Sequence, residues 1–175
     1  MRVYRIILIL LFISLIICGC KSETIEEEFY KTHKKKGQEI IYQGSVMKRP
    51  FILYKAPFDN GNFGIGLAVI EGDEATGWKL SSSNAMYNDA KLLIDQSGIN
   101  FKDNVRRYLI YGFINDPEIN KIEIVDKNNQ VIEANIIQTN WKRVYYGLVE
   151  MNELRLNAYN KNNKILFEVP YKSKN

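Results

Sequence analysis

The sequence has 175 residues, of which 46% are hydrophobic and 25% are charged, and its formal net charge is +4. These values are ordinary for a globular protein of one domain and exclude collagenous, disordered and polytopic membrane proteins. Two cysteines cannot form a disulfide framework, and a single histidine excludes a metal site built from several histidines.

The N-terminus has the pattern of a secretory signal peptide. Arg2 and Arg5 form a short basic region, and residues 6–17 are apolar except for Ser14. About twelve apolar residues are too few for a spanning helix, which needs about 20. We therefore predict that residues 1–19 are a cleaved signal peptide, with an uncleaved membrane anchor as the alternative.

The apolar region ends in Ile17-Cys18-Gly19-Cys20. This tetrapeptide resembles the lipobox of bacterial lipoproteins, although isoleucine stands where leucine is usual. The resemblance implies that a diacylglyceryl group is attached to the sulfur of Cys20 and that the chain is cleaved after Gly19. A plain secreted protein cut near Gly19 is the alternative.

The implied lipid predicts where the protein resides. Two or three acyl chains on Cys20 anchor a protein stably, so we expect it at the extracytoplasmic face of the cell membrane. Residues 20–38 then comprise the lipidated cysteine and a juxtamembrane helix or linker. A nucleic-acid partner is not expected at this location.

Residues 21–37 predict a short helix. Thr24 and Glu27 fit a capping box, and Gly37 suits the position after the last turn. Glutamates in the first turn and lysines in the last match the helix dipole. The lysines could contact anionic headgroups, but a solvated helix docked loosely on the domain is the favoured interpretation. His33 is expected to be a solvated residue of this helix.

Residues 39–175 predict a mainly β domain, an antiparallel β-sandwich. Apolar segments of strand length are separated by polar turns, which is typical of that architecture. We expect strands over residues 38–47, 50–56, 63–69, 77–80, 106–115, 121–124, 131–138, 143–150, 153–159 and 165–169. The segment 106–115 is apolar on both faces, which favours a central strand.

One further helix is predicted over residues 83–96. Met86, Ala90 and Leu93 follow helical spacing, and Ser83 suits the N-cap. Whether this segment is helical is left open by the pattern.

Two predicted hairpins, over residues 122–131 and 156–165, resemble each other. Each contains an Asn-Asn turn, and asparagine tolerates a positive φ. Residues 111–119, the Tyr145-Tyr146 pair and residues 163–165 resemble the immunoglobulin-like β-sandwich of small Bacillus-type exported lipoproteins. The resemblance implies an immunoglobulin-like fold and an exported location, and it assigns no site residues.

The candidate binding residues are aromatic and basic. Trp141, Tyr145, Tyr146 and Arg143 cluster near the start of a predicted strand. Exposed aromatic side chains can stack on sugar rings or anchor protein interfaces. Because successive side chains of a strand point to opposite faces, at least one of the two tyrosines belongs to the core. A solvated surface without a ligand is the alternative.

The sequence contains no motif for catalysis, a metal or a cofactor. Residues 81–83 lack the nucleophile elbow of hydrolases, residues 61–66 do not form a phosphate loop, and a calcium loop starting at Asp59 fails at Ile70. We therefore predict a non-enzymatic surface lipoprotein that binds a protein or a cell-envelope component. The alternatives are a cell-envelope hydrolase that uses carboxylates and a structural or assembly accessory of a membrane complex.

Overall fold

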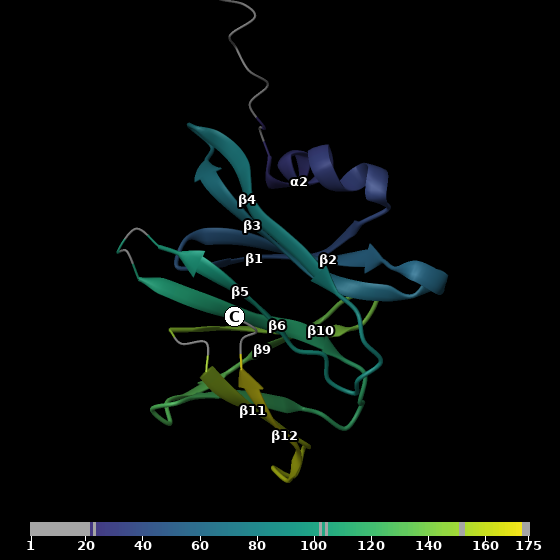
Figure 1. Cartoon of the computed structure of the whole chain (residues 1–175), viewed down its shortest axis with the longest axis vertical. Coiled ribbons are helices and arrows are strands. Elements are labelled where there is room, and N and C mark those ends of the chain that lie inside the picture. The colour runs from purple at the N-terminus through teal and green to yellow at the C-terminus, as the bar shows by residue number, and fades with distance from the viewer. Residues whose placement is uncertain (1–21, 23, 102, 104, 151–152, 173–175) are drawn as a thin grey trace, which may run out of the picture.

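The computed structural model describes residues 22, 24–101, 103, 105–150 and 153–172 (Figure 1). The predicted signal peptide and Cys20 lie outside the described residues. The helical segments are α2 (Ile25–His33) and two 3₁₀ turns, η1 (Lys34–Lys36) and η2 (Asp59–Gly61). The strands are β1 (Glu39–Val46), β2 (Arg49–Pro57), β3 (Phe63–Asp73), β4 (Gly77–Met86), β5 (Asp95–Asn100), β6 (Arg106–Ile114), β7 (Lys121–Asp126), β8 (Val131–Glu133), β9 (Asn135–Gln138), β10 (Arg143–Val149), β11 (Glu153–Tyr159) and β12 (Ile165–Lys172). Within these residues no helix combines the length and the apolar composition that crossing a membrane requires.

The strands form three antiparallel sheets that lie in successive layers (Figure 1). Sheet A has the order β1-β2-β3-β4, sheet B the order β5-β6-β10-β9, and sheet C the order β12-β11-β7-β8. Helix α2 covers the outer face of sheet A. The predicted mainly β, antiparallel fold is confirmed, with a third sheet that the sequence did not indicate. The immunoglobulin-like topology stays a prediction.

Sheet B is covered on both faces, and strand β6 shows this most clearly. Leu109, Tyr111 and Phe113 belong to the core between sheets A and B. Ile110 and Ile114 belong to the core between sheets B and C. The prediction of a central strand is therefore confirmed. Alternate residues of β6 point to opposite faces of sheet B, as the sequence pattern predicts.

The predicted capping box marks the start of α2 at Ile25, whereas Ser22, which the prediction placed in the helix, pairs with Trp78 of β4. Thr24 and Glu27 form the capping box, and Gly37 has a left-handed backbone with φ 65°. The helix packs through Phe29 on the outer face of sheet A, against residues that include Tyr54. Strand β3 presents its small residues to this side, and a Cβ atom on Gly66 would lie 2.1 Å from the Tyr54 ring. Glycine is therefore required here for close packing.

The predicted helix over residues 83–96 is wrong. Strand β4 continues through Ser83 to Met86, which pairs with Ile65 of β3, and no helix follows before β5. The Ser83 hydroxyl contacts Tyr54 at 2.8 Å instead of capping a turn. Met86 and Leu93 face the core between sheets A and B from extended segments, so their helical spacing is coincidental.

Two smaller predictions also need correction. Residues 131–138 form two strands in different sheets, because the chain passes from sheet C to sheet B at the buried residue Ala134. The Ala134 N–H donates to the Ile122 carbonyl at 2.9 Å.

The prediction that His33 is solvated is also wrong. His33 is 3% exposed, and its ring stacks on Phe29.

Candidate functional site

Three of the four predicted binding residues hold the fold together. Tyr145 is fully buried, and its hydroxyl donates to the Leu93 carbonyl at 3.0 Å. Tyr146 is half-buried, with its ring 4.9 Å from that of Phe51 in sheet A. Arg143 donates two hydrogen bonds of 2.6 Å to backbone carbonyls of the β6–β7 connection. Trp141 is the member of the group that lines a surface cleft.

The Trp141 cleft lies where four segments meet at one end of sheets A and B. Its volume is about 300 Å³, which is the lower end of the range for small-ligand sites. The segments are the start of β3, the β4–β5 connection, the residue after β6 and the β9–β10 turn. The lining residues are Gly61, Asn62, Phe63, Tyr87, Asn88, Asp89, Asn115, Trp141 and Lys142.

Local hydrogen bonds fix the position of Trp141. The Thr139 hydroxyl accepts the N–H groups of Trp141 and Lys142 at 3.1 Å and donates to the Lys142 carbonyl at 2.6 Å. Such a side-chain turn competes well with extended structure and ends β9 here. The indole packs edge-on against the buried Phe113 ring, at a centroid distance of 5.6 Å. One part of the ring is thereby held by the core while another lines the cleft.

Asn115 and Lys142 form the polar wall of the cleft. The Lys142 ammonium donates to Asn115 Oδ1 at 2.6 Å and lies 4.2 Å from the Phe113 ring centre. Burial lowers the pKa of Lys142. The Asn115 amide nitrogen donates to the Ala90 carbonyl at 2.8 Å. The side-chain positions are therefore set before any ligand arrives.

The opposite wall adds further aromatic rings. Tyr87 donates to the Asp89 carboxylate, and this hydrogen bond raises the pKa of the Tyr87 hydroxyl. Phe58 lies against Tyr87, with ring centroids 6.0 Å apart. Phe58 and Phe63 are 38% and 40% exposed, which is unusual for large apolar side chains. The cleft thus combines the exposed Phe63 ring and the half-buried rings of Tyr87 and Trp141 with amide and carboxylate groups.

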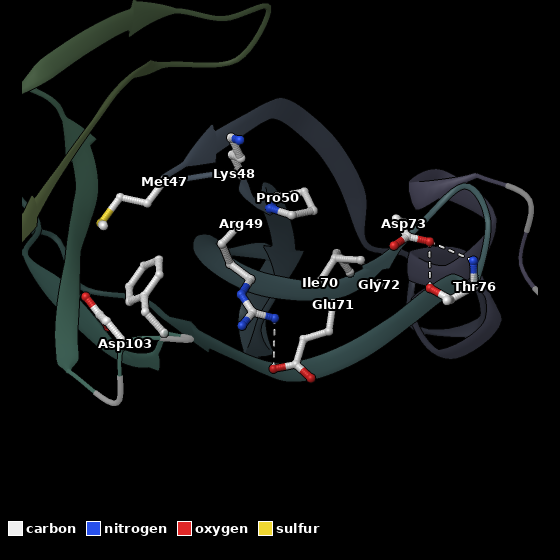
Figure 2. A pocket seen from close by; sticks show the side chains of 11 residues that line it. Met47, Lys48, Arg49, Pro50, Ile70, Glu71, Gly72, Asp73, Thr76 and Asp103 are labelled. Carbon is white, nitrogen blue, oxygen red and sulfur yellow. Dashed lines mark hydrogen bonds and ion pairs between the residues drawn. The ribbon is translucent and has the colours of Figure 1, made fainter.

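A larger cavity of about 560 Å³ lies at the opposite end of sheets A and B (Figure 2). Arg49 projects into it, forms an ion pair with Glu71 at 3.1 Å and donates to the Asn100 carbonyl at 3.2 Å. Asp73 accepts two hydrogen bonds of 2.7 Å from Thr76. We place the candidate site at the Trp141 cleft, because that cleft brings together Phe63, Tyr87 and Trp141 with several side-chain amides.

His33 and Ser83 form a contact that sequence reasoning missed. His33 Nε2 lies 2.8 Å from the Ser83 hydroxyl, and Nδ1 lies 2.8 Å from the Phe29 carbonyl. Since a carbonyl only accepts, Nδ1 carries the proton and Ser83 donates to Nε2. A nucleophile and its base share this geometry, but neither residue lines the two cavities above. The contact therefore fixes α2 on sheet A.

Comparison with family models, with curated proteins and with solved structures found no match for this chain. The class of protein is therefore defined by the fold and the cleft: three layered antiparallel sheets with an aromatic, amide-rich surface site. In the described part of the chain, no group of three or more His, Cys, Asp and Glu side chains could hold a metal ion.

Proposed function

We propose that this protein is a surface lipoprotein, anchored by lipid on Cys20, that binds a cell-envelope polysaccharide in the Trp141 cleft. The observation that carries the proposal is the grouping of Trp141, Phe63 and Tyr87 with the side-chain amides of the same cleft. The predicted binding of a protein partner remains the second candidate, since exposed aromatic rings also anchor protein interfaces.

The chemistry of the cleft suits a sugar chain. The C–H face of a pyranose ring is apolar and stacks on an aromatic ring, while its hydroxyls need hydrogen-bond partners. Asn62, Asn88 and Asn115 provide amides, which donate and accept. An open cleft leaves room for a polymer that is longer than the site.

The same cleft favours binding without hydrolysis. Glycosidases generally use two carboxylates that flank the scissile bond. Among the described residues that line the cleft, Asp89 provides the carboxylate. The protein is accordingly proposed to bind the polymer and to leave it intact.

Binding can be measured through Trp141 itself. In a Trp78→Phe background the emission comes from Trp141, and we expect it to shift on addition of purified cell-wall polysaccharide. Trp141→Ala should weaken retention on that polymer by about two- to twelvefold, because loss of one stacking contact costs about 0.5–1.5 kcal/mol. Ile165→Ala, an exposed apolar site on sheet C, is the control and should bind normally. Equal retention of both variants would exclude the cleft.

The anchor is tested independently of the ligand. Cys20→Ser removes the acceptor sulfur, so it should abolish incorporation of labelled fatty acid and release the protein into the medium. Cys18→Ser is the matched control and should remain labelled. Membrane retention of the Cys20→Ser protein would contradict the proposed anchor.

A further inference from the structure

The segment that precedes α2 is docked on the edge of sheet A. Ser22 is 2% exposed, and its carbonyl accepts the Trp78 N–H at 3.3 Å. Its hydroxyl donates to one carboxylate oxygen of Glu28 at 2.6 Å, and the other oxygen accepts the Leu80 N–H at 2.8 Å. Glu28 therefore joins Ser22 to β4, and Ser22 is part of the folded domain.

This docking leaves a very short tether. Cys20 precedes Ser22 by two positions, and two residues span at most about 7 Å even when fully extended. We propose that the surface around Ser22, formed by the start of α2 and the start of β4, lies directly against the bilayer headgroups. The inference rests on the lipidation of Cys20 proposed above. It adds that the domain lies at a short, fixed distance from the bilayer and that one defined surface of the domain faces the membrane.

The short covalent link to the lipid on Cys20, and not electrostatic attraction, holds this surface at the membrane. The first turn of α2 carries Glu26, Glu27 and Glu28, and the β3–β4 hairpin adds Asp73 and Glu74. Both elements lie at the same end of the molecule (Figure 1). Acidic groups are repelled by anionic lipids, so the apposition should be at least as close on neutral bilayers as on anionic ones.

The tether also places the Trp141 cleft away from the lipid. Strand β4 runs from Gly77, beside the docking point, to Met86, and Tyr87 of the cleft follows directly. The nine steps from Trp78 to Tyr87 cover about 30 Å of extended chain. The two tryptophans of the chain therefore report on the two ends of β4: Trp78 beside Ser22, and Trp141 in the cleft.

The experiment uses the full lipoprotein in phosphatidylcholine vesicles that carry a nitroxide quencher on the headgroup. Trp141→Phe leaves Trp78 as the reporter, and Trp78→Phe leaves Trp141. We expect Trp78 emission to fall by roughly half and Trp141 emission to be unchanged, because a tether of about 7 Å holds only the former near the headgroups. With anionic phosphatidylglycerol vesicles the quenching of Trp78 should be no stronger, because the acidic surface is repelled by them.

A linker variant separates the tether from other causes of quenching. About ten Gly and Ser residues inserted between Lys21 and Ser22 add roughly 17 Å of flexible chain. The variant should remain lipidated but lose the quenching of Trp78. Mass spectrometry confirms that the lipid is present in each variant. If the lipid is present, unchanged quenching of Trp78 after the insertion, or equal quenching of both tryptophans, would overturn the proposal that this surface faces the membrane. A native chain recovered without lipid would overturn the anchor and this inference together.

Discussion

Replacing His33 with phenylalanine tests how a buried imidazole stabilises the fold. The His33 ring lies parallel to the Phe29 ring, with centroids 4.1 Å apart. Burial lowers the pKa of His33 below its ordinary value of 6.5, and repulsion from Lys36 lowers it further, against the hydrogen bond with the Phe29 carbonyl. Phenylalanine keeps an aromatic ring at this position but cannot titrate.

The sign of the pH effect follows from that shift. In the unfolded chain the pKa of histidine is near 6.5, so the unfolded state takes up the proton first as the pH falls. The stability contributed by neutral His33 is therefore fully present above pH 6.5 and declines below it. The loss between about pH 7.5 and about pH 5.5 cannot exceed about 1.4 kcal/mol, which is the limit for one histidine that takes up no proton in the folded state. Carboxylates titrate mainly below this window.

Urea unfolding of the unlipidated Cys20→Ser protein, followed by tryptophan fluorescence, measures both effects. His33→Phe should be less stable at about pH 7.5 by about 1–3 kcal/mol, because the Phe29 carbonyl and Ser83 lose a partner. Its stability should then change little down to about pH 5.5, whereas the parent protein loses up to about 1.4 kcal/mol. The same pH dependence in both proteins would refute the role of His33.

The remaining predictions concern backbone positions. Gly112→Ala places a Cβ atom 1.8 Å from the Leu93 carbonyl oxygen, so we expect a loss of about 3 kcal/mol or more, seen as a lower urea midpoint. Asn129 and Asn163 have φ values of 60° and 58°. Either one changed to valine should lose about 1–2 kcal/mol, while the glycine variants should unfold like the parent. A valine variant as stable as its glycine counterpart would contradict this reasoning.

The strands and their turns could be predicted because local chemistry fixes them. In both repeated hairpins, a side-chain oxygen accepts two backbone N–H groups: Asp126 those of Asn128 and Gln130, and Asn160 those of Asn162 and Lys164. These contacts span at most four residues. A pattern of residue types within a short window is sufficient to specify them.

The layer to which a strand belongs could not be predicted in the same way. Residues 131–138 read as one apolar strand, but β8 pairs with β7 and β9 pairs with β10. Which partner a strand finds depends on tertiary packing around Ala134, and the alternation within the strand carries no information on it. The contact of His33 with Ser83 has the same origin, since 50 residues separate the two.

The layering also explains where recognition can occur in this fold. When both faces of a sheet are covered, the side chains on both faces of its strands are buried. Tyr145 and Tyr146 therefore both pack against neighbouring sheets, although they point to opposite sides of sheet B. Side chains of sheet B reach solvent mainly where strands end. Trp141 lies in the turn before β10, so its side chain can reach solvent. In a stack of sheets, a candidate binding residue is therefore identified by its residue type and its position in a turn, more than by strand alternation.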